Sequence, residues 1–286
     1  MDASADPPVA ELRGTRLAGR TVLVVGGGST GDYPGTGSAT ARLFGAQGAN
    51  LVVMGRSVEH TARTVSQIAA EGGQALPVIG DTTLAADCAR AVSAAVGRFG
   101  GLDAVVNNVA VHKGVSVDGF DDATWDEIFD GNLKAPMLMA SAAVEALRES
   151  GGGSIVNIGS VAGLQASGQI GYGTAKAALI PLTRDMAMVL GKDGIRVNCV
   201  IPGHLHTPHV AKVSGGNERR ELRNRLNMLG TEGTGWDAAW AALYFACDES
   251  RFVTGQSLAV DGGVTSVLAF TQVMRSGYVD PAELGG

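Results

Sequence analysis

Cysteine is scarce in this chain of 286 residues, and excess positive charge and long apolar runs are absent. Its three cysteines, Cys88, Cys199 and Cys247, are widely spaced. They exclude a disulfide framework and predict a reducing, cytoplasmic location. No apolar run approaches the ~18 residues of a membrane span. The acidic start MDASADPPVAELRG also lacks the basic and apolar regions of a signal peptide.

Basic residues number 22 against 28 acidic ones, which gives a net charge of −6. This balance lacks the basic surface that nucleic acids and anionic membranes attract, so neither partner is expected. Hydrophobic residues make up 45% of the chain, which excludes wholesale disorder. The 42 glycines show no three-residue period, so they predict many tight turns and not collagen.

Short apolar segments alternate with helical patterns along most of the chain. Such alternation predicts an α/β fold: a three-layer, doubly wound parallel sheet of Rossmann type in a single domain. Any ligand would bind at the carboxyl ends of the strands. Strands are expected at 21–25, 50–54, 74–79, 104–107, 154–158, 196–201 and 257–260, and helices at 38–47, 58–71, 85–99, 124–149 (kinked at Pro136), 172–190 and 237–247.

The sequence predicts three parts. Residues 1–18 read as a flexible polar arm, and 19–263 as the main domain. Residues 207–236 interrupt the alternation inside that domain and are expected to form a lid over the substrate. Residues 264–286 follow the last strand as a carboxyl-terminal extension.

Glycines crowd the turn between the first strand and the first long helix. Glycine there permits close approach to a pyrophosphate at a helix N-terminus. We interpret Gly27 as the first glycine of this turn, with Gly35 and Gly37 opening the helix. About four extra residues then fall within 29–34. Asp32 and Tyr33 either project toward the cofactor or belong to a surface bulge.

The second strand ends without the carboxylate that would bind the 2′-hydroxyl of an NAD ribose. Arg56 stands there instead, and a guanidinium pairs well with a 2′-phosphate. NADP(H) is therefore favoured over NAD(H), although Asp32 would repel that phosphate.

Tyr172 and Lys176 lie four residues apart, so they share one face of a helix. The ammonium group is expected to lower the pKa of the tyrosine and to make it a general acid/base. Ser160 follows a predicted strand twelve residues earlier, and Asn132 lies two elements before it.

With these residues in order, the chain resembles the short-chain dehydrogenase/reductase family over roughly 17–263. Further matching motifs are Asn107-Asn108-Val109-Ala110, Pro202-Gly203 with Thr207, and Val260-Asp261-Gly262-Gly263. The sequence departs from the family pattern in the altered and lengthened glycine turn, in Val109-Ala110, in Gly235-Trp236-Asp237, and in the carboxyl-terminal extension. These departures leave cofactor choice and substrate open, but not the reaction class.

The resemblance implies a role for each of four residues. Tyr172 would exchange a proton with the substrate oxygen, and Ser160 would hydrogen-bond that oxygen. Lys176 would bind the nicotinamide ribose, and Asn132 would hold a water that links Lys176 to solvent. Cofactor contacts are expected from Gly27, Gly35, Thr36, Gly37, Arg56, Asp81, Thr82, Asn108, Val109, Ala110, Tyr172, Lys176, Pro202, Gly203, Leu205 and Thr207.

Histidines gather near the expected substrate. His204, His206 and His209 have spacing suggestive of a metal site, but no acidic or cysteine partner is nearby, so no metal is expected. His204, His206 and His209 are predicted to line the substrate pocket, together with His112, Lys113 and Gln169.

The predicted function is NAD(P)(H)-dependent interconversion of a secondary alcohol and a ketone, with NADPH-driven ketone reduction slightly favoured. The alternative is NAD-dependent oxidation of a cyclic or polyol alcohol. Enoyl reductases share the fold but typically have a wider tyrosine–lysine spacing. A non-catalytic cofactor sensor is the alternative from a different class. The resemblance further implies a homotetramer, with the apolar stretch at 180–190 and the last strand as the candidate contacts.

Overall fold

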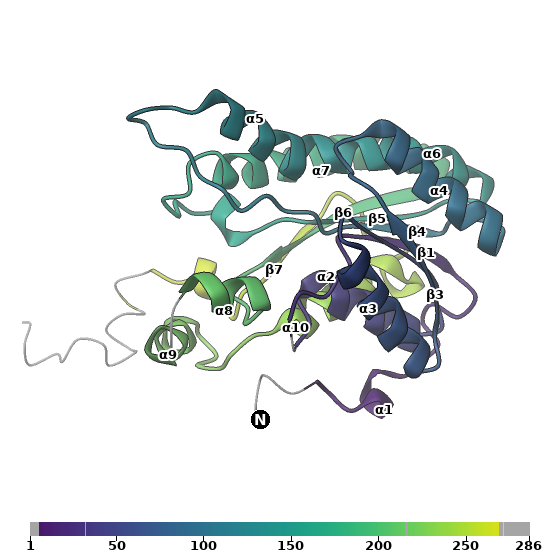
Figure 1. The fold of residues 1–286 in the computed structure, drawn as a ribbon, viewed down its shortest axis with the longest axis horizontal. Coiled ribbons are helices and arrows are strands. Elements are labelled where there is room, and N and C mark those ends of the chain that lie inside the picture. Colours follow the sequence, from purple (N-terminus) through teal and green to yellow (C-terminus); the bar gives the residue numbers. More distant parts are fainter. Residues whose placement is uncertain (1–5, 32, 215–216, 269–270, 272–286) are drawn as a thin grey trace, which may run out of the picture.

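The computed structural model describes residues 6–31, 33–214, 217–268 and 271. Seven parallel strands form one sheet in the order β3-β2-β1-β4-β5-β6-β7, with helices on both faces (Figure 1). The predicted three-layer, doubly wound α/β fold is thereby confirmed. The strands are β1 (Thr21–Val25), β2 (Asn50–Gly55), β3 (Gln74–Ile79), β4 (Ala104–Asn107), β5 (Gly153–Ile158), β6 (Ile195–Pro202) and β7 (Ser257–Val260).

Two helical layers cover the sheet (Figure 1). One holds α2 (Thr36–Ala46), α3 (Val58–Ala70) and α10 (Gly235–Ala246). The other holds α4 (Ala85–Phe99), α6 (Ala135–Glu149) and α7 (Tyr172–Leu190). The central strand β1 serves both layers because its side chains alternate: Val22 and Val24 join the core under α2 and α10, whereas Leu23 and Val25 join the core under α4 and α6.

Three smaller helices, α1, α8 and α9, lie outside these two layers (Figure 1). The lid segment forms α8 (Pro208–Ser214) and α9 (Asn217–Leu226), which lie together beside β7 (Figure 1). The third, α1 (Val9–Leu12), lies in the predicted arm.

The arm is packed where the structure describes it. Leu12 and Leu17 are buried, and the Gln47 side chain donates a hydrogen bond to the Leu12 carbonyl at 2.6 Å. Arg42, itself buried, pairs with Asp6 at 2.6 Å. Residues 6–18 therefore differ from the flexible arm that the sequence predicts, because two leucines anchor them on α2. Residues 1–5 lie outside the described part.

The predicted helix over 124–149 is three elements instead of one. Helix α5 (Asp122–Phe129) passes into a wider π turn (Asp130–Lys134) before α6 begins. Pro136 has no N–H to donate to the carbonyl of Asn132, four residues earlier. The predicted disturbance at Pro136 is thus real, and it places Asn132 inside the turn.

Candidate active site

The four residues predicted as a catalytic tetrad come together at the carboxyl ends of β4 and β5. Tyr172 and Lys176 lie in the first turns of α7, and Ser160 immediately follows β5. A hydrogen bond joins the side chains of Ser160 and Tyr172. Gly163 permits this approach, since a Cβ atom there would lie 2.7 Å from the Ala177 nitrogen of α7. The turn that carries Ser160 can therefore pack directly on the helix that carries Tyr172.

Lys176 is fully buried behind the tyrosine. Its Nζ donates hydrogen bonds to the carbonyls of Ile158 at 2.8 Å and Val109 at 3.4 Å. Burial lowers its pKa to about 8. The ammonium form is therefore in the majority at neutral pH and declines as the pH rises through about 8.

Burial raises the pKa of Tyr172, and the hydrogen bond with Ser160 opposes that rise. The prediction that Lys176 lowers this pKa is wrong for this structure, because desolvation of the phenol dominates. Tyr172 consequently keeps its proton at neutral pH and can donate it.

Asn132 lies beneath the tip of β4, fully buried. Its side chain accepts a hydrogen bond from the Val111 nitrogen at 3.2 Å and donates to the Val111 carbonyl at 3.0 Å. Since Lys176 contacts Val109, both side chains fix the same short segment after β4. The water that the resemblance assigns to Asn132 stays a prediction.

Tyr172, Ser160 and Lys176 line a cavity of about 460 Å³, called here the tyrosine cavity. Most of the predicted site residues line it too: Thr36, Asn108, Val109, Ala110, His112, Gln169, Pro202, Gly203, His204, Leu205 and Thr207. His209, which was also predicted to line the pocket, does line this cavity. Lining residues that the sequence did not predict include Gln165, Ser167, Val210 and Arg223. These four lie on loops and on α8 and α9, whose path the strand–helix pattern does not determine.

A second cavity of about 400 Å³, the glycine-loop cavity, meets the first at Val109 and Ala110. Arg56, Asp81 and Thr82 line it, as predicted for the adenosine side of a dinucleotide site. His60 lines it as well and was not predicted.

The turn after β1 fits a close approach of backbone and cofactor. Gly26 has φ of +72°, and a Cβ atom there would lie 2.6 Å from the Asn108 carbonyl oxygen. A Cβ atom at Gly37 would lie 2.1 Å from the Gly26 carbonyl oxygen. The first glycine of the turn is therefore Gly26 and not Gly27 as interpreted from the sequence, since Gly27 packs on Val53 of β2. Gly35 precedes α2 directly, as predicted.

Two predicted substrate residues do not line the tyrosine cavity. Lys113 is an exposed side chain that forms an ion pair with Glu127 of α5. His206 is buried, stacks on Tyr33 with ring centroids 4.7 Å apart, and lies 3.7 Å from Glu232. Tyr33 thus joins the inserted glycine loop to the lid, and Gly31 of the same loop packs near Pro208. Asp32 lies outside the described residues.

His112 lies between the tyrosine and the lid. Its ring centroid is 4.9 Å from that of Tyr172 and 4.0 Å from that of His209. Burial, helped by His209 and Lys176, lowers the pKa of His112 to about 4. The imidazole is therefore neutral at working pH. Among the described residues, no cluster of histidine, cysteine or acidic side chains is arranged to hold a metal ion.

Comparison with known proteins agrees with this geometry. Residues 32–265 match the profile of a family described as enoyl-(acyl carrier protein) reductase. A 2,5-dichloro-2,5-cyclohexadiene-1,4-diol dehydrogenase, LinX of Sphingobium indicum, is 35% identical over 87% of this chain and 97% of its own. The chain belongs to the short-chain dehydrogenase/reductase family. It is accordingly an oxidoreductase that acts on the CH–OH/C=O couple.

Solved structures of the family superpose closely. A short-chain type dehydrogenase/reductase from Mycobacterium ulcerans has a TM-score of 0.81 at 30% identity, over 87% of this chain and 91% of its own. Levodione reductase has a TM-score of 0.82 at 27% identity, over 88% of this chain and 100% of its own. Family membership implies NAD(P) as cofactor. No helix among the described residues is long and apolar enough to cross a bilayer.

Proposed function

We propose that this protein interconverts a secondary alcohol and a ketone with NADP(H), and that Tyr172, Ser160, Lys176 and Asn132 form its catalytic tetrad. The observation that carries the proposal is the contact between Ser160 and Tyr172 in a cavity backed by the buried Lys176. When bound, the nicotinamide supplies or accepts the hydride.

The side chains divide the remaining work. Ser160 donates a hydrogen bond to the substrate oxygen and orients the carbonyl. Tyr172, kept protonated by burial, donates its phenolic proton to that oxygen in reduction and recovers one from the alcohol in oxidation. Lys176, held by the Ile158 and Val109 carbonyls, would bind the nicotinamide ribose. Asn132 holds the Val111 backbone and so fixes the segment after β4, whose Val109 and Ala110 line both cavities.

NADP(H) is proposed over NAD(H) because Arg56 lines the glycine-loop cavity at the tip of β2. Its guanidinium is exposed there and can pair with a 2′-phosphate. Asp81, the acidic residue in this cavity, is less available to bind the 2′-hydroxyl of NAD, since Thr83 already donates two hydrogen bonds to its Oδ1.

A second candidate is NAD-dependent oxidation of a cyclic or polyol alcohol. Its support is the relative LinX, which is named as a cyclohexadienediol dehydrogenase. Enoyl reduction, which the matched family description names, is less well supported because Tyr172 and Lys176 are four residues apart.

The test is a panel of ketones, cyclic diols, polyols and an enoyl thioester, each with both cofactors and followed by the absorbance of reduced nicotinamide. Ketone turnover with NADPH supports the first proposal, and diol turnover with NAD⁺ alone supports the second. Turnover of the enoyl thioester alone would contradict both. Turnover of any of these substrates excludes a pure sensor.

We further propose a homotetramer, because apolar side chains are exposed on two separate elements. Met188 of α7 is 86% exposed, and Phe252 near the edge strand β7 is 98% exposed. Two faces of this kind can each pair across a two-fold axis. Light scattering is expected to give four subunits for the parent and fewer for Met188→Glu. A monomeric parent at micromolar concentration would refute this.

A further inference from the structure

Helix α7 is attached to the sheet by side-chain hydrogen bonds at two levels. At the first, Lys176 Nζ donates to the carbonyls of Ile158 at 2.8 Å and Val109 at 3.4 Å. The second is at Thr183, which follows Lys176 by seven residues and so lies on the same face of the helix, about 10 Å further along its axis. The Thr183 hydroxyl accepts a hydrogen bond from the Asn157 side-chain nitrogen at 3.0 Å.

Asn157 extends the second attachment across the sheet. Its side-chain oxygen accepts a hydrogen bond from Asn107 Nδ2 at 2.9 Å, and these two residues are register partners on β5 and β4. Thr183 in turn donates to the Leu179 carbonyl at 2.8 Å. The side chains of Asn107, Asn157 and Thr183 are all buried. They form one hydrogen-bonded series from β4 through β5 to α7, called here the asparagine chain.

The asparagine chain lies next in sequence to the groups that accept from Lys176. Asn157 immediately precedes Ile158, and Asn107 lies two residues before Val109. The asparagine chain therefore joins the two strand ends that supply the carbonyl acceptors, and it joins both to the helix that supplies the ammonium group. A shift of α7 along its axis would disturb both attachments together.

The same face of the sheet is otherwise apolar around this point. Val105, Ile155 and Val197 of the strands belong to one core cluster with Met186 and Ala187 of α7. Apolar contacts have little directional preference, whereas a hydrogen bond restricts distance and angle. The asparagine chain thus adds directional contacts that can hold α7 at one position along the strands.

We infer that Asn157 and Thr183 are positioning residues for Lys176: through the asparagine chain they fix α7 along the strands, and so fix the distances from Nζ to its two carbonyl acceptors. The inference rests on the proposed function only for the catalytic role of Lys176. A purely structural role would lower stability alone, whereas a positioning role also changes the properties of the lysine.

The titratable groups around Lys176 are Tyr172 on the same helix, Cys199 of β6 and His112 after β4. A hydrogen bond also joins Cys199 to Thr183, but burial raises the pKa of this thiol to about 11. The pKa of Tyr172 is raised by burial too, and that of His112 is lowered to about 4. Near pH 8, Lys176 is therefore the member of this group that changes charge.

Thr183→Val removes the hydroxyl with little change of shape. Longer contacts from Nζ to the carbonyls favour the ammonium form less, so we expect the pKa of Lys176 to fall below its value of about 8. For the best substrate of the panel above, kcat should fall by roughly 10- to 100-fold, the effect of a displacement of about 1 Å. Thr183→Ser restores the hydroxyl and should return both quantities toward those of the parent.

Ser154→Ala is the matched control on the same strand. Its buried hydroxyl donates to the Phe245 carbonyl at 2.8 Å, at the opposite end of β5 from Asn157. Loss of this hydroxyl should lower stability and leave kcat and the pKa of Lys176 unchanged.

A double variant, Asn157→Leu with Thr183→Val, separates positioning from stability and replaces Thr183→Val if that variant does not fold. Two apolar side chains of similar shape leave no unpaired group between them, so stability should partly return. They cannot fix α7 along the strands, so kcat and the pKa of Lys176 should stay lowered. Recovery of kcat together with stability would overturn the inference in favour of a purely structural role.

Carbon-13 NMR of lysine-labelled protein measures the pKa of Lys176 without substrate or turnover. The chain has five lysines and the other four are exposed, so the buried one should titrate apart from them, and Lys176→Arg assigns its signal. A lowered pKa in Thr183→Val, in a protein that turns over none of the panel, would support the inference while the proposed function fails. An unchanged pKa of Lys176 in both the folded Thr183→Val and the double variant would overturn it.

Discussion

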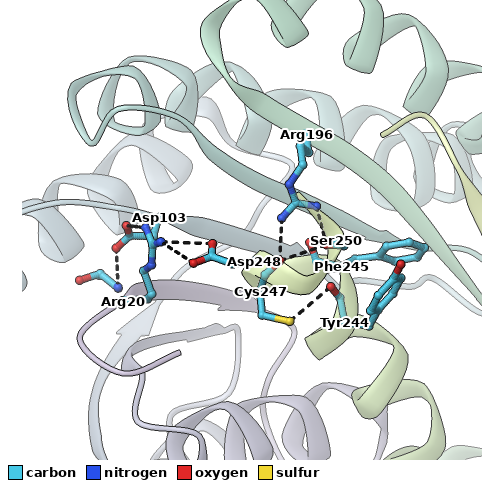
Figure 2. A network of polar contacts seen from close by, with 9 residues as sticks. Arg20, Asp103, Arg196, Tyr244, Phe245, Cys247, Asp248 and Ser250 are labelled. Carbon is cyan, nitrogen blue, oxygen red and sulfur yellow. Dashed lines mark hydrogen bonds and ion pairs between the residues drawn. The ribbon is translucent and has the colours of Figure 1, made fainter. Parts of the chain in front are cut away.

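The two ends of the parallel sheet are built for different purposes. At the amino ends, Arg20 bridges Asp103 at 3.0 Å and Asp248 at 3.3 Å, and Arg196 donates to the Ser250 hydroxyl at 2.7 Å (Figure 2). These bonds join the starts of β1, β4 and β6 to the turn after α10. At the carboxyl ends, the strands stop beside open cavities lined by the candidate active-site residues.

This difference follows from chain direction. In a parallel sheet every strand ends at the same edge, and the loops that follow must reach outward to the next helix. At the amino ends the chain arrives from the preceding helices, and ion pairs such as Arg20–Asp103 join the incoming segments to one another. Substitutions at the amino ends should therefore lower the free energy of unfolding, whereas substitutions at the carboxyl ends should lower activity. The variants below are ordered from the largest expected effect to the smallest.

Tyr172→Phe at the carboxyl end removes only the hydroxyl that donates the proton. We expect kcat to fall by roughly 10²–10⁴-fold, the usual contribution of a general acid/base. The melting temperature and the affinity for NADPH should stay close to those of the parent. Near-normal turnover would disprove the proposed role of Tyr172.

Arg196→Met at the amino end should lower stability and leave activity unchanged. The guanidinium donates to Ser250 and to the Cys247 carbonyl at 3.2 Å, so its loss leaves both groups short of a donor. We expect the free energy of unfolding to fall by roughly 1.5–3 kcal/mol, with kcat per folded molecule unchanged.

Arg63→Met is the control for that variant. Its ion pair with Glu59 is exposed and lies within one helix, so the cost should stay below about 0.5 kcal/mol. Denaturant unfolding of the three proteins gives the comparison. A loss of kcat in folded Arg196→Met would show that the two ends are not separable.

Arg56→Ala tests whether cofactor binding can be changed separately from the chemical step at the carboxyl end of the sheet. We expect NADPH to bind roughly 10- to 100-fold more weakly, because one charged hydrogen-bonding partner is lost, and NADH to bind almost as before. Fluorescence titration of both cofactors measures this. An unchanged ratio of the two dissociation constants would return the preference to NAD(H).

His112→Asn probes how a desolvated imidazole at the carboxyl end of the sheet reduces stability in acid. The folded-state pKa of His112 is about 4, below its ordinary 6.5, so the unfolded chain binds more protons between these values. Stability should therefore fall as the pH drops from 6.5 toward 4. The variant should lose less stability over that range, in urea unfolding at several pH values. Identical pH slopes for the two proteins would contradict the lowered pKa of His112.

The sequence by itself determined the order of elements and the reaction class. Continuous apolar strands such as Thr21–Val25 and the fixed distances among Ser160, Tyr172 and Lys176 are local properties of the chain. Most strand bounds were predicted within one residue for that reason. The boundary of α5 was missed, because the π turn depends on how Asn132 packs beneath β4.

Only the tertiary structure decided which side chains face the cavity and in which protonation state. His204 and His209 line it, while His206 turns to Tyr33 of a distant loop and Lys113 turns to Glu127. The pKa of Tyr172 rises because desolvation, which depends on every neighbour, outweighs the hydrogen bond with Ser160. The orientation and burial of a side chain arise from contacts between segments far apart in sequence, and these contacts cannot be read from residue spacing.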